Sequence, residues 1–371
     1  MKKIIAILLV LVMILSVASC SEYEPVKSTK EESRVMMTLT ADGEEYELRY
    51  ELYRALFLNF KSEIDGGDPS VWSGEDSLKY IEAINRLIAD AAANIFAVMH
   101  ICETVADYDL YSGKADKRVE EYIKESVEGG SGSLGLGSYE AYLLHLKDQN
   151  LNYSVQDLLY RYYIALEEID RYFMGDTDAD SITDDEIDTP HLDAPVQSVR
   201  AFYYSDSCKR VLYAYLSELV LENENPKFDI NAYHEKMVAA ASRGRGDVEV
   251  VIAGSAAQDI KTGLFLSRNA YNAYNEDYLK VINDAAFALS DGEVSEIVTV
   301  DGTGDSTIDG FYILYGIEKS EEDFLKYYTQ IRLAYMNDAL GTMLTAKKNE
   351  LIRSIVFTED YTTVSHKDIS M

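Results

Sequence analysis

The sequence is poor in cysteine, in basic residues and in tryptophan, and each shortage excludes something. Three Cys in 371 residues are too few for a disulfide scaffold or a Cys-rich zinc module. The 34 Lys and Arg stand against 65 Asp and Glu, a net charge of −31. A chain this negative repels phosphate backbones, which excludes nucleic acid as a partner. One Trp beside 29 Tyr makes the aromatic surface mostly amphipathic.

The length and the hydrophobic content indicate a folded protein. A hydrophobic share of 47% and a charged share of 27% are ordinary for globular chains and exclude wholesale disorder. A chain of 371 residues suggests two domains, or one domain with a large insertion.

Signals for metal or nucleophile chemistry are absent or incomplete. No two of the five histidines have metal-ligand spacing, so no metal is expected; they are His100, His145, His191, His234 and His366. Asp176, Asp178 and Asp180 match the start of an EF-hand loop. The loop then has Ser181 at its sixth position and Ile187 at its twelfth, which favours a solvated acidic linker. No Gly-Xaa-Ser-Xaa-Gly elbow follows a strand, so hydrolase chemistry has no support.

The first twenty residues have the pattern of an export signal. Lys2 and Lys3 precede an unbroken apolar run over residues 4–15, which is too short to span a membrane. Small residues then lead to Cys20, an arrangement that resembles the lipobox of bacterial lipoproteins, whose cysteine is lipidated and becomes the new N-terminus. An ordinary secretory signal with a coincidental cysteine is the alternative. We expect a location outside the cytoplasm, anchored to the cell membrane by lipid at Cys20.

The region up to residue 174 predicts a hairpin followed by helices. Alternating residues over 35–49 surround Ala41-Asp42-Gly43, a plausible hairpin turn. Ser154 begins a capping box that ends at Asp157. Apolar residues at helical spacing predict helices over 50–64, 78–99, 116–127, 139–146 and 154–173.

Beyond an acid-rich linker over 175–197, the pattern becomes mixed. Strands are predicted over 199–204, 248–253, 297–300, 310–317 and 355–363. Helices are predicted over 206–221, 230–241, 275–289 and 324–353, the last with a cap that starts at Ser320. Cys102 and Cys208 are expected to be buried small apolar residues in different domains. The fold class is therefore α+β, with a β-containing segment inserted between helical segments.

A run late in the chain carries a family signal. Ala286-Phe287-Ala288-Leu289 is followed by Gly292-Glu293-Val294-Ser295 and, after a short strand, by a strand over 310–314. This order resembles parvulin-type prolyl isomerase domains, in which a Gly-aromatic-His-Ile-Ile strand comes last. Upstream, residues 199–204 look like the first strand of that family, and Leu266-Ser267-Arg268 looks like the turn before its last helix.

The surroundings of that run resemble PrsA/SurA-type extracytoplasmic foldases. In those proteins a helical chaperone domain is completed by the chain that follows the parvulin insert. The resemblance implies a signal peptide over 1–19, a flexible tether over 20–33, a SurA-like chaperone region over 34–190, a parvulin-like domain over 196–319, and a C-terminal helix and strand over 320–371 that complete the chaperone domain.

Carried across residue by residue, the resemblance implies a degenerate active site. Tyr203 and Tyr312 fall where the family has histidines, on its first and last strands. The catalytic Cys or Asp has no clear counterpart, although Asp259 is nearby. The substrate pocket is expected to be lined by Leu266, Tyr278, Ile282 and Phe287.

The resemblance implies a membrane-anchored chaperone that binds unfolded or newly exported polypeptides, with a weak or inactive parvulin domain and no cofactor. Its acidic charge could attract basic clients. An active prolyl isomerase with an altered pocket is one alternative. A solute-binding lipoprotein is another, but it needs strand–helix alternation in two lobes, which the first 170 residues lack. The sequence leaves clients and oligomeric state open.

Overall fold

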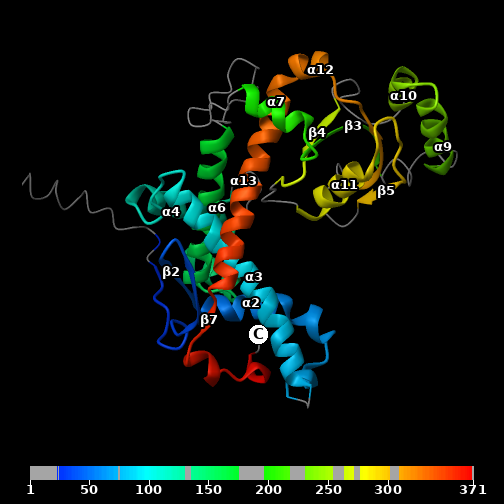
Figure 1. The fold of residues 1–371 in the computed structure, drawn as a ribbon. Helices are drawn as coiled ribbons and strands as arrows, with labels where there is room; N and C mark the ends of the chain where they lie inside the picture. Colours follow the sequence, from blue (N-terminus) through cyan, green and yellow to red (C-terminus); the bar gives the residue numbers. More distant parts are fainter. Residues whose placement is uncertain are drawn as a thin grey trace, which may run out of the picture. The chain divides into compact units, whose positions relative to one another are not determined.

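The chain divides into two compact units in the computed structural model, whose ribbon is drawn in Figure 1. Unit 1 comprises residues 1–168 and 347–371, and unit 2 comprises residues 169–346. The structure describes residues 23, 25–73, 76–129, 135–174, 196–217, 230–253, 263–270, 276–300 and 309–369.

Unit 1 contains a small antiparallel sheet that joins the two ends of the chain. Strands β1 (Val35–Ala41) and β2 (Glu44–Arg49) form the predicted hairpin. Its two-residue turn has Asp42 at φ 49° and Gly43 at φ 84°, the positive values that a tight hairpin turn requires. Strand β7 (Val356–Phe357) pairs with the other edge of β1 and gives the order β2-β1-β7. The C-terminal chain therefore completes this sheet.

The helices of unit 1 follow the predicted pattern closely. They are α2 (Tyr50–Asp65), α3 (Ser77–Thr104), α4 (Gly113–Glu128), α5 (Tyr139–Asp148) and α6 (Tyr153–Met174), with short 3-10 helices η1 (Pro69–Trp72), η2 (Asp360–Thr363) and η3 (His366–Asp368). The predicted capping box at Ser154 is wrong. The side chain of Asn152 accepts a hydrogen bond from the Val155 amide at 2.9 Å, so Asn152 caps α6, which begins at Tyr153.

Helix α3 is the central helix of unit 1. By length and composition it is apolar enough to cross a membrane, the one such helix in the described part of the chain. However, 67% of its most apolar window is buried inside the protein, as expected for a core helix.

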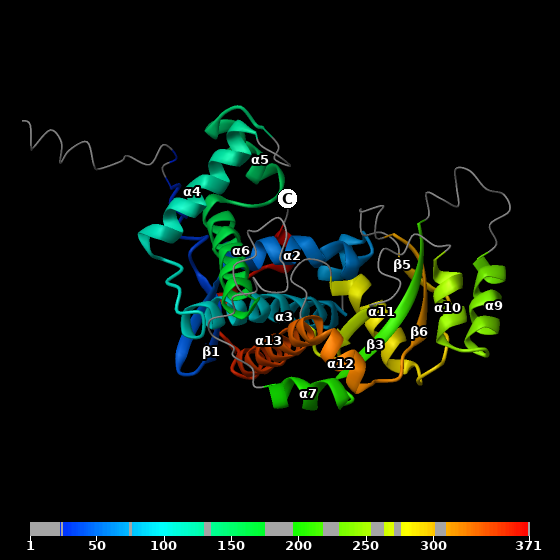
Figure 2. The ribbon, with the colours of Figure 1, turned by 90° about the horizontal axis from the view of Figure 1, so that it is seen from above.

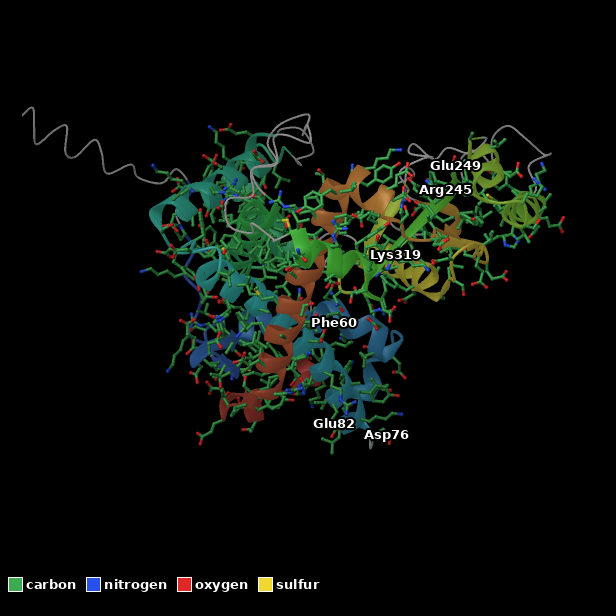
Figure 3. All side chains as sticks on the ribbon, turned by 45° about the horizontal axis from the view of Figure 1, so that its top comes forward. Phe60, Asp76, Glu82, Arg245, Glu249 and Lys319 are labelled. Atoms are coloured by element: carbon green, nitrogen blue, oxygen red, sulfur yellow. The ribbon has the colours of Figure 1, made fainter. Side chains whose placement is uncertain are left out.

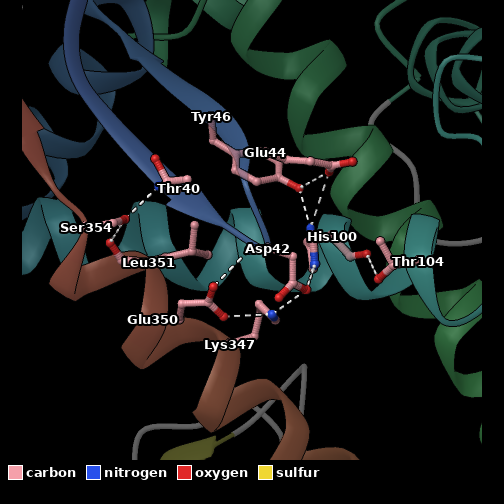
Figure 4. Close-up of polar contacts among 10 residues, drawn as sticks. All are labelled: Thr40, Asp42, Glu44, Tyr46, His100, Thr104, Lys347, Glu350, Leu351 and Ser354. Atoms are coloured by element: carbon pink, nitrogen blue, oxygen red, sulfur yellow. Dashed lines mark hydrogen bonds and ion pairs between the residues drawn. The ribbon is translucent and has the colours of Figure 1, made fainter.

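The end of helix α13 (Tyr328–Arg353) meets the hairpin turn through a polar network, which Figure 4 shows. Lys347 Nζ lies 2.7 Å from Asp42 Oδ2 and 2.8 Å from Glu350 Oε2. Asp42 also lies 2.9 Å from Nε2 of the buried His100, whose Nδ1 is 2.6 Å from Tyr46 Oη. One hairpin thus contacts both the core helix α3 and the returning helix α13.

Unit 2 is built on a four-stranded antiparallel sheet of order β4-β3-β6-β5. Its strands are β3 (Cys208–Ser217), β4 (Leu264–Ser267), β5 (Val298–Val300) and β6 (Gly310–Gly316), and its helices include α7 (Val196–Tyr204), α9 (Ile230–Ala241), α10 (Arg245–Ile252), α11 (Glu276–Ala288) and α12 (Glu321–Lys326). Figure 2 shows α11 on one face of the sheet and α9 and α10 on the other.

Three predictions for unit 2 are wrong. Residues 199–204 form helix α7 because Val199, Phe202 and Tyr203 recur at helical spacing and bury one face. Residues predicted as a helix over 206–221 instead form β3, the central strand, which is buried on both faces and so reads as a nearly continuous apolar run. The apolar residues at 248–253 belong to α10, where Val248 and Ile252 face the core one turn apart.

The long C-terminal helix predicted over 324–353 is interrupted. Ser320 caps α12 as expected, since its Oγ accepts a hydrogen bond from the Asp323 amide at 3.1 Å. The chain leaves helical geometry at Tyr327, with φ −117°, and α13 starts at the next residue.

Both described cysteines are buried free thiols, as predicted. Cys102 lies on α3 in unit 1 and Cys208 on β3 in unit 2. Burial raises the pKa of each to about 12.

Candidate functional site

Three tyrosines line the face of the unit 2 sheet that packs on α11. Tyr213 and Tyr215 are alternate residues of β3, so their side chains point to the same face. Tyr312 of β6 pairs directly with Tyr215 in the strand register. Its ring centroid lies 4.8 Å from that of Tyr215 and 6.2 Å from that of Tyr213. We call these three residues the tyrosine face.

The tyrosine face is part of one apolar cluster. Tyr213 and Tyr215 are half-buried, whereas Tyr312 is 8% exposed. Tyr215 Oη donates a hydrogen bond to the Asp309 carbonyl at 3.0 Å, which fixes that ring. The other buried residues of the cluster are Val211, Ile282, Ala286, Val298, Val300 and Leu314, and Leu264, Leu266, Ala285 and Leu289 are partly buried against it.

The structure brings together three of the predicted site residues. Tyr312, Ile282 and Leu266 all belong to this one cluster. Phe287 is half-buried, with the Arg268 guanidinium 4.5 Å from its ring centroid. Tyr278 lies within α11, but its side chain is outside the described residues, as are Asp259, Cys20, the signal peptide and the acidic segment 175–195.

Tyr203 lies elsewhere. Because residues 199–204 are a helix, its buried ring packs against Phe324 of α12, with centroids 5.7 Å apart. Its Oη accepts a hydrogen bond from the Ser320 amide at 3.3 Å. Tyr203 therefore belongs to the hydrophobic cluster around α7 and α12, whereas Tyr312 belongs to the cluster around α11. Tyr203 and Tyr312, which the resemblance placed at two histidine positions of one site, thus lie in different clusters.

Sequence reasoning missed Tyr213 and Tyr215. Their signal was the alternation of Val211, Tyr213 and Tyr215 with Leu212, Ala214 and Leu216. β-Branched and aromatic residues at period two favour a strand. The same run also satisfies helical spacing, which led to the wrong assignment.

A buried ion pair joins β3 to α12. Arg210 is fully buried, with its guanidinium 5.1 Å from the Phe265 ring centroid and 4.6 Å from that of Tyr327. Its Nη1 lies 2.6 Å from Asp323 Oδ2. Burial would raise the pKa of Asp323, but the hydrogen bond and charge of Arg210 outweigh it and lower that pKa. Arg245, which Figure 3 labels near Glu249 on α10, lies 3.5 Å from the same carboxylate.

The tyrosine face combines apolar surface with phenolic hydroxyls. Its described residues are apolar or phenolic, and the described part of the chain contains no group of three or more His, Cys, Asp or Glu able to hold a metal. Tyrosine rings bury large apolar area while their hydroxyls still hydrogen-bond, the combination that peptide-binding surfaces use.

The chain is similar to solved structures of PrsA foldases. It matches the foldase protein PrsA of Lactococcus lactis at 15% identity, covering 91% of this chain and all of that one, with a TM-score of 0.22. PrsA of Bacillus subtilis matches at 12% identity over 87% and 93%, with a TM-score of 0.23. PrsA of Streptococcus pneumoniae matches at 14% identity over 78% and 93%, with a TM-score of 0.27. No family model and no curated protein matches the chain.

Proposed function

We propose that this protein is an extracytoplasmic chaperone, lipid-anchored at Cys20, that binds unfolded or newly exported polypeptides. In this proposal the unit 2 sheet has a parvulin-like role in binding peptides but contributes little or no prolyl isomerisation. The tyrosine face is the observation that carries it, because the half-buried rings of Tyr213 and Tyr215 lie beside the buried Tyr312 within one apolar cluster.

The parvulin resemblance supports the second part of the proposal once its first strand is corrected to β3. Tyr312, where the resemblance places a family histidine, pairs directly with Tyr215 of β3. Catalysis lowers a rotational barrier of about 18–20 kcal/mol by binding the twisted imide with aimed hydrogen bonds. Tyrosine is longer than histidine and fills the slot that such a substrate needs.

Refolding kinetics test this proposal. The full chain is added to a protein whose refolding is limited by prolyl isomerisation, first at one part in a hundred and then at equimolar concentration. Uncatalysed isomerisation takes tens to hundreds of seconds, so modest catalysis is visible. We expect no acceleration at the low ratio and suppressed aggregation at the high ratio.

Two results would contradict the proposal. Acceleration at the low ratio that disappears in Tyr312→Phe would make the protein an active isomerase that uses the phenol. A failure to suppress aggregation at equimolar concentration would remove the chaperone assignment altogether. Tyr163→Phe on α6 is the matched control, since its ring is 43% exposed and lies in unit 1.

The solute-binding alternative is not favoured. It predicted two lobes of alternating strands and helices. Within the described residues, the sheets are one three-stranded and one four-stranded antiparallel sheet, and unit 1 is otherwise helical.

A further inference from the structure

Unit 1 has an apolar groove of about 660 Å³ between α3 and the end of the chain. Its volume lies in the range of about 300–1,000 Å³ typical of ligand sites. The apolar lining is formed by Leu78, Ile81, Ala89, Ile352, Ile355 and Phe357.

Much of this lining is open to solvent. Leu78 is 71% exposed and Phe357 is 45% exposed. Scattered exposed apolar residues are normal, but these lie together around one groove. Such a patch indicates an interaction site.

The groove adjoins a short sheet edge. Strand β7, which contains Phe357, is the last strand of the order β2-β1-β7 and pairs only with β1 in the described sheet. Natural edge strands are commonly protected by charged residues, by proline or by being very short. β7 is two residues long, and Ser354-Ile355-Val356-Phe357-Thr358 contains no charged residue and no proline. An extended chain can therefore hydrogen-bond along this edge while its side chains enter the groove.

The acidic surroundings of the groove favour a cationic occupant. In the lining itself the charges balance, since Glu82 and Asp90 lie beside Arg86 and Asp90 pairs with Lys348 at 2.8 Å. Figure 3 labels Asp76 close to Glu82 at the start of α3, and two more acids, Glu359 and Asp360, follow β7. The whole chain carries −31, so its field attracts basic segments and repels acidic ones.

We propose that this groove binds an extended polypeptide segment, in which apolar residues alternate with lysine or arginine, as an added strand beside β7. This inference rests on the proposed chaperone function. It names the kind of polypeptide segment that the chaperone recognises. The period of two places every second side chain in the groove and the basic ones toward solvent and the surrounding acids.

Fluorescence anisotropy with labelled peptides tests this site on the full chain. The probe is a ten-residue peptide that alternates valine with lysine. A second peptide has the same sequence with alternate backbone nitrogens methylated, which keeps the side chains and removes the donors of a β ladder. A third peptide replaces each lysine with glutamate. We expect the first peptide to bind and each of the other two to bind at least tenfold more weakly.

Two groove variants localise the binding. Leu78→Gln and Phe357→Thr each remove an exposed apolar side chain, so we expect about fivefold weaker binding with an unchanged circular dichroism spectrum. Leu144→Gln on α5 is the matched control, because Leu144 is 63% exposed in the same unit and does not line the groove. The control should bind as tightly as the unmodified chain.

The outcomes separate this inference from the proposed function. If the unmodified chain suppresses aggregation and the groove variants bind the peptide equally well, the groove assignment is wrong and the chaperone proposal stands. If the methylated peptide binds equally well, the proposal that the peptide binds as an added strand is wrong. Concentration-dependent dimerisation that Leu78→Gln abolishes would assign the groove to a second copy and likewise overturn the proposal.

Discussion

Unit 1 and unit 2 each contain an ion pair made by a helix late in the chain, and the two pairs differ in how far they are exposed to solvent. In unit 1, Lys347 of α13 meets Asp42, whose side chain is 63% exposed. In unit 2, Asp323 of α12 meets Arg210, whose side chain is 0% exposed. The two ion pairs have nearly equal distances, 2.7 and 2.6 Å. Burial rather than distance decides their energies, since solvent screens the first pair and not the second.

The largest effect is expected from Asp323→Asn. The substitution removes the negative charge that lies 2.6 Å from the buried Arg210 guanidinium, which costs about 3 kcal/mol in the free energy of unfolding. Urea denaturation followed by a unit 2 signal measures it. Glu321→Gln on the same helix is the control, because Glu321 pairs with Arg200 at the exposed surface. Its loss should be below about 1 kcal/mol, and equal losses in both variants would break the comparison.

A loss of stability of intermediate size is expected at acidic pH, and it should appear first in unit 1. His366 is buried against Tyr53, with Nε2 3.0 Å from Tyr53 Oη, and burial lowers its pKa from 6.5. The unfolded chain then binds a proton that the folded chain does not, so stability falls as the pH drops below 6.5. The lowered pKa of Asp323 in unit 2 acts only as the pH falls below 3.8.

Unfolding free energies measured across pH test this order. His366→Gln should flatten the unit 1 profile just below pH 6.5. His145→Gln on α5 should leave that profile unchanged. A unit 1 stability that stays constant down to the range of the carboxylates would show that His366 does not destabilise the folded unit in acid.

The smallest effect is expected from Asp42→Asn. Hydrogen bonds to Lys347 and His100 lower the pKa of this exposed carboxyl. Asparagine tolerates the positive φ of the turn, so the hairpin should persist. We expect a loss in thermal stability that is smaller than for Asp323→Asn and that disappears in 1 M salt, because exposed charges are screened. A salt-insensitive loss would mean that this network behaves as a buried one.

The sequence predicted the hairpin and the helices of unit 1 and was misleading for part of unit 2. In unit 1 the strand predicted over 355–363 is only Val356–Phe357, and Asp360–Thr363 is a 3-10 helix. Amphipathic helices such as α2 and α6 have one polar face, so their period is visible. Strand β3 lies between two cores, and its Val211, Leu212 and Tyr215 satisfy helical and strand patterns equally. Pairing with β4 and β6, both distant in the sequence, selects the strand. The local period-two signal alone does not decide between the two.

The candidate site was predicted in part for the same reason. Tyr312 and Ile282 were found because the run around them follows a recognisable order of helix, turn and strand. Tyr203 was paired with Tyr312 only because the first strand had been placed one element too early. The groove beside β7 had no sequence signal, since it forms from residues of α3 and from the chain's last twenty residues.

The two buried cysteines allow the transient opening of each unit to be measured separately. Each thiol, Cys102 in unit 1 and Cys208 in unit 2, is inaccessible in the folded state and has a pKa of about 12. An alkylating reagent can modify either one only during a transient opening of the surrounding structure. Labelling rates resolved by mass spectrometry would therefore give two opening free energies from one unmodified chain.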